Sequence, residues 1–259
     1  MPLFIKGVPS SIITNQFTNN NILDNVDLKT FNSQLYFDLQ NTNSLVLDSG
    51  VRQIADLSGN NNHPTQNTAA NRPEYTHILG LPCVRFNIGM SNRWLNFNDQ
   101  FFVQSQYQIF SVLGRGSSRA WIQGNLSSSS NKCLHFGLDD TTFHLGHYNN
   151  DYAVTIGTSP LNTPIVVNIG LNSTGKFIKI NGYPINQSTQ TTLLSAGSTG
   201  MFGRAVNATY QCFIHEYVAF NRNLDVDTSN LIEAYLARKW KTTNRFNPNH
   251  IHYNLAIAA

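Results

Sequence analysis

One segment of the chain carries a side-chain oxygen at every second position. Asp56, Ser58, Asn60 and Asn62 hold these oxygens, and Gly59 lies in the middle of the run. Asn and Asp tolerate left-handed backbone and hydrogen-bond their own main chain, while glycine supplies a positive φ without steric cost. Such a segment is neither a strand nor a helix interior, so we predict a turn that is lined by oxygen atoms.

A second position of chemical interest is Glu216, in the predicted strand 213–220. A period of two places Ile214, Glu216, Val218 and Phe220 on one face of this strand, and His215, Tyr217 and Ala219 on the other. Glu216 is then an acid on an apolar face, where an unpaired charge is costly or is forced neutral. We therefore expect this carboxylate to have a partner.

Aromatic rings beside hydrogen-bonding side chains can hold a sugar, by stacking on the pyranose and by binding its hydroxyl groups. Such a combination occurs in the segment Tyr148-Asn149-Asn150-Asp151-Tyr152, where we predict a carbohydrate-binding site. Two tryptophans, Trp94 and Trp121, are further candidate platforms. Large aromatic side chains are mostly buried, so we expect both of them in the core.

The paired carboxylates of a glycosidase are missing from the sequence. A retaining mechanism needs two closely spaced acids, but the three glutamates, Glu74, Glu216 and Glu233, share no motif. Asp139 and Asp140 are adjacent, so on a strand they would point to opposite faces. The sequence also has no Ser/His/Asp or Cys/His motif and no glycine loop for phosphate. We predict a protein that is not an enzyme.

Composition bounds the class of protein and its partners. The 259 residues suffice for one large β domain, and only 12% of them are charged, with a net charge of +3. Nucleic acid and membranes are therefore not expected as partners. The three cysteines are Cys83, Cys133 and Cys212. Their odd number and wide spacing predict buried thiols rather than disulfides. No membrane span or secretory signal is recognisable, so we expect synthesis in a cytoplasm.

The elements that position these residues are mostly short strands separated by turns. The predicted strands are 84–87, 108–113, 120–123, 132–138, 142–147, 152–155, 165–171, 177–180 and 212–220. Many short strands without intervening helices predict an antiparallel sandwich or barrel. A helix is predicted after Asp225, a good N-cap, because Ile232, Leu236 and Trp240 recur every four residues.

Both ends of the chain differ from the middle. Residues 1–30 and 244–259 are polar and aperiodic, whereas residues 31–243 show no internal boundary. We predict an N-terminal arm, a single domain and a C-terminal arm with these bounds. Arms of this kind dock on their own domain or on a neighbouring chain.

Four groups of residues carry a family resemblance. Phe37-Asp38 with Ser49-Gly50-Val51 looks like an opening Asp and a short hairpin, and Asp56 to His63 looks like a D-x-SGNGNH loop. Asn71-Arg72-Pro73 with Val84-Arg85-Phe86 is similar to an NRP…VRF segment, and Ile214 to Leu224 with Tyr235 to Trp240 looks like the last strand and its helix. Together they resemble the concanavalin A-like lectin/glucanase superfamily, in particular its laminin-G-like (LamG) modules. The resemblance implies an all-β fold, an antiparallel two-sheet jelly-roll sandwich with one C-terminal helix.

The resemblance also implies a calcium site. In similar modules the acid at the position of Glu216 faces the oxygen-lined loop, often across a calcium ion. Asp56, Asn60, Asn62 and Glu216 would be the ligands here, since calcium prefers carboxylate and amide oxygens. The alternative is that Glu216 accepts backbone N–H bonds from the loop without a metal.

These observations favour a non-catalytic structural or adhesive protein of a virus (phage) particle, such as a capsid decoration, fibre or tail component with a lectin-like fold. It would be made in the host cytoplasm and become part of the virion. Its expected partners are other virion proteins or further copies of itself, through the arms, and surface glycans. The alternatives are a free-standing carbohydrate-binding lectin and, with less support, a glycoside hydrolase.

Overall fold

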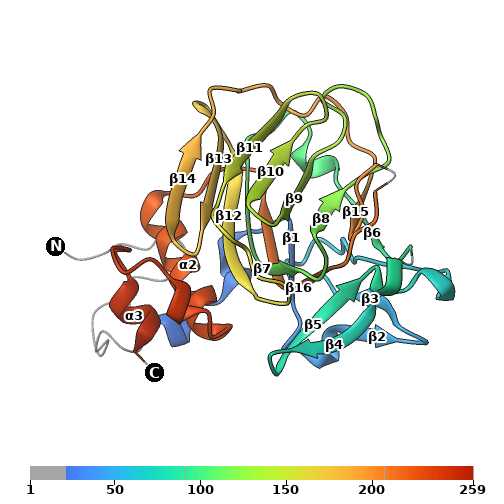
Figure 1. Ribbon diagram of the computed structural model, residues 1–259, viewed down its shortest axis with the longest axis horizontal. Helices are drawn as coiled ribbons and strands as arrows, with labels where there is room; N and C mark the ends of the chain where they lie inside the picture. The colour runs from blue at the N-terminus through green and yellow to red at the C-terminus, as the bar shows by residue number, and fades with distance from the viewer. Residues whose placement is uncertain (1–21, 91, 207, 259) are drawn as a thin grey trace.

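A computed structural model describes residues 22–90, 92–206 and 208–258 of the protein. The first 21 residues of the predicted N-terminal arm lie outside this range. Two large sheets, packed face to face, form most of the described structure (Figure 1).

The larger sheet has eight strands, seven of them in one row. In spatial order these are β14 (Tyr183–Gln187), β13 (Gly175–Ile180), β12 (Ile165–Asn172), β7 (Tyr107–Arg115), β16 (Cys212–Phe220), β5 (Leu81–Phe86) and β4 (Glu74–Ile78). The eighth strand, β1 (Leu35–Asp38), also pairs with β16.

The second large sheet has six strands. In order they are β11 (Asp151–Thr155), β10 (Thr142–Gly146), β9 (His135–Asp139), β8 (Arg119–Gly124), β15 (Thr199–Phe202) and β6 (Leu95–Asn98). A small sheet pairs β2 (Leu45–Leu47) with β3 (Val51–Ile54). All these strand pairs are antiparallel. The predicted fold class, an all-β two-sheet sandwich, is confirmed.

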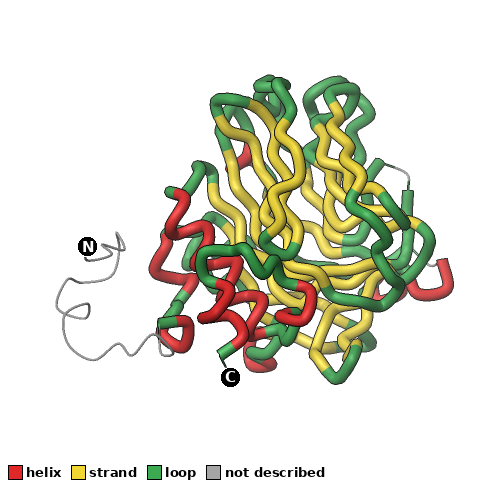
Figure 2. The backbone as a smooth tube through the Cα atoms, turned by 60° about the vertical axis from the view of Figure 1, so that its left-hand side comes forward, coloured by secondary structure: helices red, strands yellow, loops and turns green. Residues whose placement is uncertain are grey.

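Alternation along the strands builds two apolar clusters. On β12, Ile165, Val167 and Ile169 belong to the inner cluster between the sheets, whereas Val166 belongs to an outer cluster. The outer cluster lies between the eight-stranded sheet and the helices that cover its outer face (Figure 2). The two large sheets therefore differ, because only the eight-stranded sheet is apolar on both faces along its central strands.

Helix α2 (Val226–Lys239) is the long helix of the described chain. Its N-cap is Asp225, as predicted, and the Asp225 carboxylate accepts a hydrogen bond of 2.8 Å from the Thr228 amide. Ile232, Leu236 and Trp240 are fully buried against the sheet. No helix of the described chain combines the length and the apolar character that crossing a bilayer requires.

The remaining helical elements are short. They are α3 (Tyr253–Ile257) and the 3-10 turns η1 (Leu23–Asn25), η2 (Leu28–Phe31), η3 (Thr42–Ser44), η4 (Ala69–Asn71), η5 (Ile88–Met90), η6 (Gln100–Phe102) and η7 (Thr243–Arg245). Leu23 and Leu28 near one terminus, and Phe246 and Ala256 near the other, are buried in the outer cluster. The described parts of both terminal segments therefore dock on their own domain.

Strand β16 does not alternate regularly. Its register with β7 shifts between Ile214 and Glu216, as in a β-bulge. Ile214 therefore faces the inner cluster with Tyr217, while His215 lies against Trp240 with its ring centroid 4.9 Å away. The predicted grouping of Ile214 with Glu216 is wrong, since a regular period of two cannot anticipate the extra residue.

Candidate functional site

The predicted oxygen-lined turn exists, and the side chain of Asp56 organises it. Asp56 is buried, and its Oδ1 accepts hydrogen bonds from the amides of Tyr36 (3.0 Å) and Ser58 (2.9 Å). Its Oδ2 accepts from the Ser58 hydroxyl (2.8 Å) and the Asn62 amide (3.0 Å). Four donors on one carboxylate hold the turn closed, so Asp56 has a structural role.

The two asparagines tie this turn to the rest of the domain. Asn60 Nδ2 donates to the carbonyl oxygen of Ser33 (2.9 Å). Asn62 Nδ2 donates to the carbonyl of Asn98 (2.7 Å), and Asn62 Oδ1 accepts from the Asn98 amide (2.8 Å). Asn61 has a φ of 57°. Asparagine tolerates this left-handed conformation, so the residue fits the turn.

Glu216 lies apart from the turn. Its fully buried carboxylate accepts hydrogen bonds from the Tyr36 hydroxyl (3.2 Å) and Trp240 Nε1 (2.5 Å), and it pairs with Lys239 Nζ at 2.7 Å. Burial raises the pKa of Glu216 to about 7, although the Lys239 ammonium opposes that shift. Tyr36 connects Glu216 to the turn, because its amide donates to Asp56 and its hydroxyl donates to Glu216.

The residues predicted to bind calcium do not fit such a site. Both oxygens of Asp56 and the Oδ1 of Asn62 already accept hydrogen bonds from the protein, and Glu216 is paired with an ammonium group. Calcium needs at least six oxygen ligands. The described residues also contain no group of three or more His, Cys, Asp or Glu side chains placed to hold a metal. Calcium binding remains a prediction without support from this geometry.

The predicted carbohydrate segment forms the turn between β10 and β11. Tyr148 and Asn149 have left-handed backbone (φ 45° and 60°), and Asn149 and Asp151 are exposed. Asn150 is anchored, since its side chain donates to Asn131 Oδ1 (3.2 Å) and its carbonyl accepts from Lys176 Nζ (2.9 Å). Tyr152 packs against the inner cluster. The exposed part of this segment therefore consists mainly of Asn149 and Asp151.

Asp151 connects this turn to the outer face of the six-stranded sheet. Its Oδ1 lies 3.2 Å from Nε2 of the buried His135. Burial disfavours the charged imidazole, but the hydrogen bonds to Asp151 and to the Cys133 carbonyl outweigh it and raise the pKa of His135 to about 9. The same contact lowers the pKa of Asp151. The pair is therefore ionic at neutral pH.

Trp121 lies beside this pair, on the same outer face. The residue is partly exposed, and its cross-strand partner is Gly137. A Cβ on Gly137 would lie 2.8 Å from Trp121 Cε3, so the glycine leaves the space that the indole occupies. The centroids of the His135 and His144 rings lie 5.3 and 5.8 Å from that of Trp121. The expectation that Trp121 packs in the sandwich core is wrong.

A second histidine–carboxylate pair also lies near this indole. His144 Nε2 is 3.3 Å from Asp139 Oδ2, and both side chains are about one quarter exposed. We call Trp121, His135, His144, Asp139 and Asp151 the Trp121 face. Sequence alternation could have found it, because Ala120 and Ile122 are apolar core residues and leave Trp121 pointing outward.

Trp94 is not in the core either. It is partly exposed before β6, and the Arg204 guanidinium lies 4.9 Å from its ring centroid. The indole Nε1 donates to Asn96 Oδ1 at 3.0 Å. The guanidinium and the hydrogen bond already occupy part of this ring.

Comparison with known proteins shows the fold. No family model matches the chain, and no curated protein matches it. Among solved structures, the binding domain of Paraclostridial Mosquitocidal Protein 1 is similar, with a TM-score of 0.57 and 14% identity over 80% of this chain and 53% of that one. A structure from work on the cell entry of botulinum neurotoxin type C is similar as well, with a TM-score of 0.53 and 14% identity. The match covers 81% of this chain and 53% of that one.

Trypanosoma rangeli sialidase is also similar, with a TM-score of 0.54 and 12% identity over 80% of this chain and 33% of that one. The protein therefore spans about half the length of the two toxin structures and a third of the sialidase. At these identities the likeness concerns the fold alone, which is a coarse concanavalin-like β-sandwich.

Proposed function

We propose that the protein is a non-catalytic, lectin-like module that binds carbohydrate on the Trp121 face. The observation that carries this proposal is the partly exposed Trp121 indole, which packs over Gly137 beside two histidine–carboxylate pairs. An indole offers an apolar surface for the C–H face of a sugar, and carboxylates accept hydrogen bonds from its hydroxyl groups. Because each acid already pairs with a histidine, the geometry of the acceptors is set before a ligand arrives.

The positions of the acids favour binding over hydrolysis. Glu74 is exposed on β4, Glu216 is paired with Lys239, and Glu233 is fully buried on α2. Each of the three glutamates therefore has a different environment, and the two aspartates of the Trp121 face are each paired with a histidine. Glycoside hydrolysis requires two acids on either side of one bond. Among the proteins with similar structures, botulinum neurotoxin type C depends on interaction with two ganglioside molecules for its entry into cells. That finding about another protein supports testing glycans here.

The test compares two tryptophans on an array of immobilised glycans. We expect Trp121→Ala to lose about tenfold or more in apparent affinity, corresponding to about 1.4 kcal/mol. Trp94→Ala serves as the matched control, since Trp94 is also partly exposed but outside the Trp121 face. Unchanged binding by Trp121→Ala, or binding of no glycan by the parent protein, would refute the proposal.

We further propose the family and the biological role that the sequence favours. The protein would be a LamG-type module that serves as a structural or adhesive protein of a virus particle. Its support is the charge-poor composition together with a fold shared with binding domains of larger proteins. Particles from producing cells can be separated on a density gradient and searched for peptides of this chain. A fixed ratio to a capsid protein supports the virion role, and presence only among free proteins supports a separate lectin.

A further inference from the structure

A pocket of about 470 Å³ opens on the outer face of the eight-stranded sheet, where α2 begins. Its lining comes from β7, β12, β13, β14 and the start of α2, and includes Gln108, Asn168, Phe177, Lys179, Gln187 and Asn223. Helix α2 starts at Val226, so the part of the sheet beyond that end is not covered by it. The volume lies within the range of pockets that hold small ligands, about 300–1,000 Å³.

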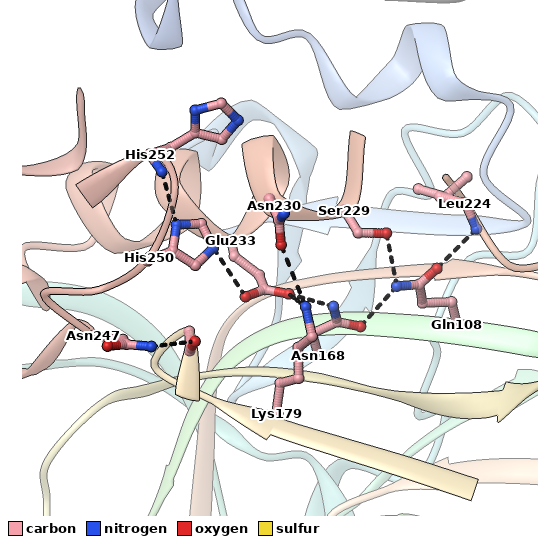
Figure 3. Close-up of polar contacts among 11 residues, drawn as sticks. Gln108, Asn168, Lys179, Leu224, Ser229, Asn230, Glu233, Asn247, His250 and His252 are labelled. Atoms are coloured by element: carbon pink, nitrogen blue, oxygen red, sulfur yellow. Dashed lines mark hydrogen bonds and ion pairs between the residues drawn. The ribbon is translucent and has the colours of Figure 1, made fainter. Parts of the chain in front are cut away.

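The floor of this pocket is a fixed network of polar side chains (Figure 3). Gln108 Nε2 donates to Asn168 Oδ1 (2.9 Å) and Ser229 Oγ (3.1 Å), and Gln108 Oε1 accepts from the Leu224 amide (2.8 Å). Asn168 Nδ2 in turn donates to Glu233 Oε1 (2.5 Å). These side chains are buried and mutually hydrogen-bonded, so they form a preorganised surface.

The charged side chains near the floor of this pocket are paired with one another. Glu233 is fully buried, and its carboxylate pairs with Lys179 Nζ at 3.1 Å. His250 Nε2 lies 3.4 Å from the second oxygen of Glu233 (Figure 3). Burial opposes ionisation, but His250, Lys179 and Asn168 together lower the pKa of Glu233. An anionic Glu233 and a cationic Lys179 leave the pocket without a strong excess of either charge.

The walls offer unused hydrogen-bonding atoms next to an aromatic ring. Asn172, Gln187 and Asn223 each use one end of the amide in protein hydrogen bonds: Asn172 Oδ1 accepts, and the two NH₂ groups donate. Within the described residues this leaves Asn172 Nδ2, Gln187 Oε1 and Asn223 Oδ1 for a ligand. The partly exposed Phe177 ring lies over Gly170, where a Cβ would come within 2.8 Å of Phe177 Cε1.

We propose that this pocket is a second carbohydrate-binding site, which takes one neutral sugar residue against Phe177. The amide groups of Asn172, Gln187 and Asn223 would bind its hydroxyls, with Lys179 as a further donor. Amides can donate and accept, as hydroxyls do, whereas charge-compensated walls give little advantage to an anion. The proposal is independent of the Trp121 face, because the two sites lie on the outer faces of different sheets.

The experiment records ¹H–¹⁵N spectra of the protein while methyl glycosides of glucose, galactose and mannose, and N-acetylglucosamine, are added at millimolar concentrations. We expect at least one sugar to shift the side-chain amide signals of Asn172 and Asn223. Val226→Trp should weaken this effect about tenfold, because it places an indole at the rim. Ile251→Trp is the matched control: both parent residues are 70% exposed, and only Val226 lines the pocket.

The variants separate this proposal from the proposed function. Trp121→Ala should leave the shifts of Asn172 and Asn223 unchanged, whereas Val226→Trp should leave binding at the Trp121 face unchanged. The second site is refuted if none of the four sugars shifts the pocket signals, or if Val226→Trp and Ile251→Trp respond to the sugars alike. Either result would leave the test of the Trp121 face unaffected.

Discussion

The outer faces of the two large sheets differ in how far their polar groups are buried. On the eight-stranded sheet, α2 and the terminal segments bury an apolar cluster and an ionic group made of Glu216, Lys239 and Asp38. On the six-stranded sheet, the Trp121 face keeps its histidine–carboxylate pairs partly exposed beside a partly exposed indole. Buried polar groups that satisfy one another stabilise a fold, whereas exposed ones remain available to a ligand. The comparison places the buried stabilising groups on the covered part of the eight-stranded sheet and the proposed Trp121 site on the six-stranded sheet.

The largest expected effect concerns stability. Lys239→Met leaves the buried Glu216 carboxylate without its cation, and breaking such a pair costs about 3–5 kcal/mol. On the six-stranded sheet, His144→Gln removes a partly exposed pair and should cost less than about 1 kcal/mol. Urea denaturation measures both free energies of unfolding. Equal losses would contradict the assignment of stability to the covered face.

The next effect is a pH dependence of opposite sign on the two faces. Salt-bridged His135 on the six-stranded sheet has a pKa raised to about 9. Its contribution to stability is therefore complete below the unfolded pKa of about 6.5 and is lost as the pH rises through about 9. Asp151→Asn should remove this alkaline loss from the curve of unfolding free energy against pH.

His215, on the covered face, should behave in the reverse way. Burial beside Trp240 lowers the pKa of His215 to about 4. Its contribution is present above the unfolded pKa of about 6.5 and is lost as the pH falls through about 4. His215→Gln should reduce the acid branch of the same curve while preserving the alkaline branch. A variant that changes both branches equally would show that the two faces are not independent.

The smallest expected effect concerns calcium. Because Glu216 is occupied by Tyr36, Lys239 and Trp240, Glu216→Gln should lower the melting temperature by the same amount in calcium and in a chelator. Calorimetric melting curves under both conditions provide the measurement. A loss that occurs only in calcium would instead place a metal between this acid and the Asp56 turn.

The sequence predicted elements that are long or strongly patterned. All nine predicted strands occur, with small differences at their ends, and Asp225 caps the predicted helix. Short strands such as β6 and β14 were not predicted, since Asn occupies the exposed positions of β6 and a proline lies within β14. Propensity and periodicity are too weak over four or five residues to outweigh such turn-forming residues.

The candidate site was predicted only in part. Asp151 belongs to the predicted carbohydrate segment, but His135 and Trp121 come from strands that are distant in the sequence. Antiparallel pairing brings β8, β9, β10 and β11 side by side, and a single sequence does not reveal that register. Ile214 was assigned to the wrong face for a similar reason, because the bulge in β16 depends on its pairing with β7.

The most direct measurement of the central claim follows the indole N–H signals of the three tryptophans in ¹H–¹⁵N spectra. Each signal can be assigned from a Trp→Phe variant, and the titrant is a glycan that the array identifies. We expect the Trp121 signal to shift on titration, while the Trp240 signal, whose N–H is bonded to Glu216, stays in place. A glycan that loses affinity in Trp121→Ala but binds the parent protein without moving the Trp121 signal would contradict the assignment of its binding to the Trp121 face.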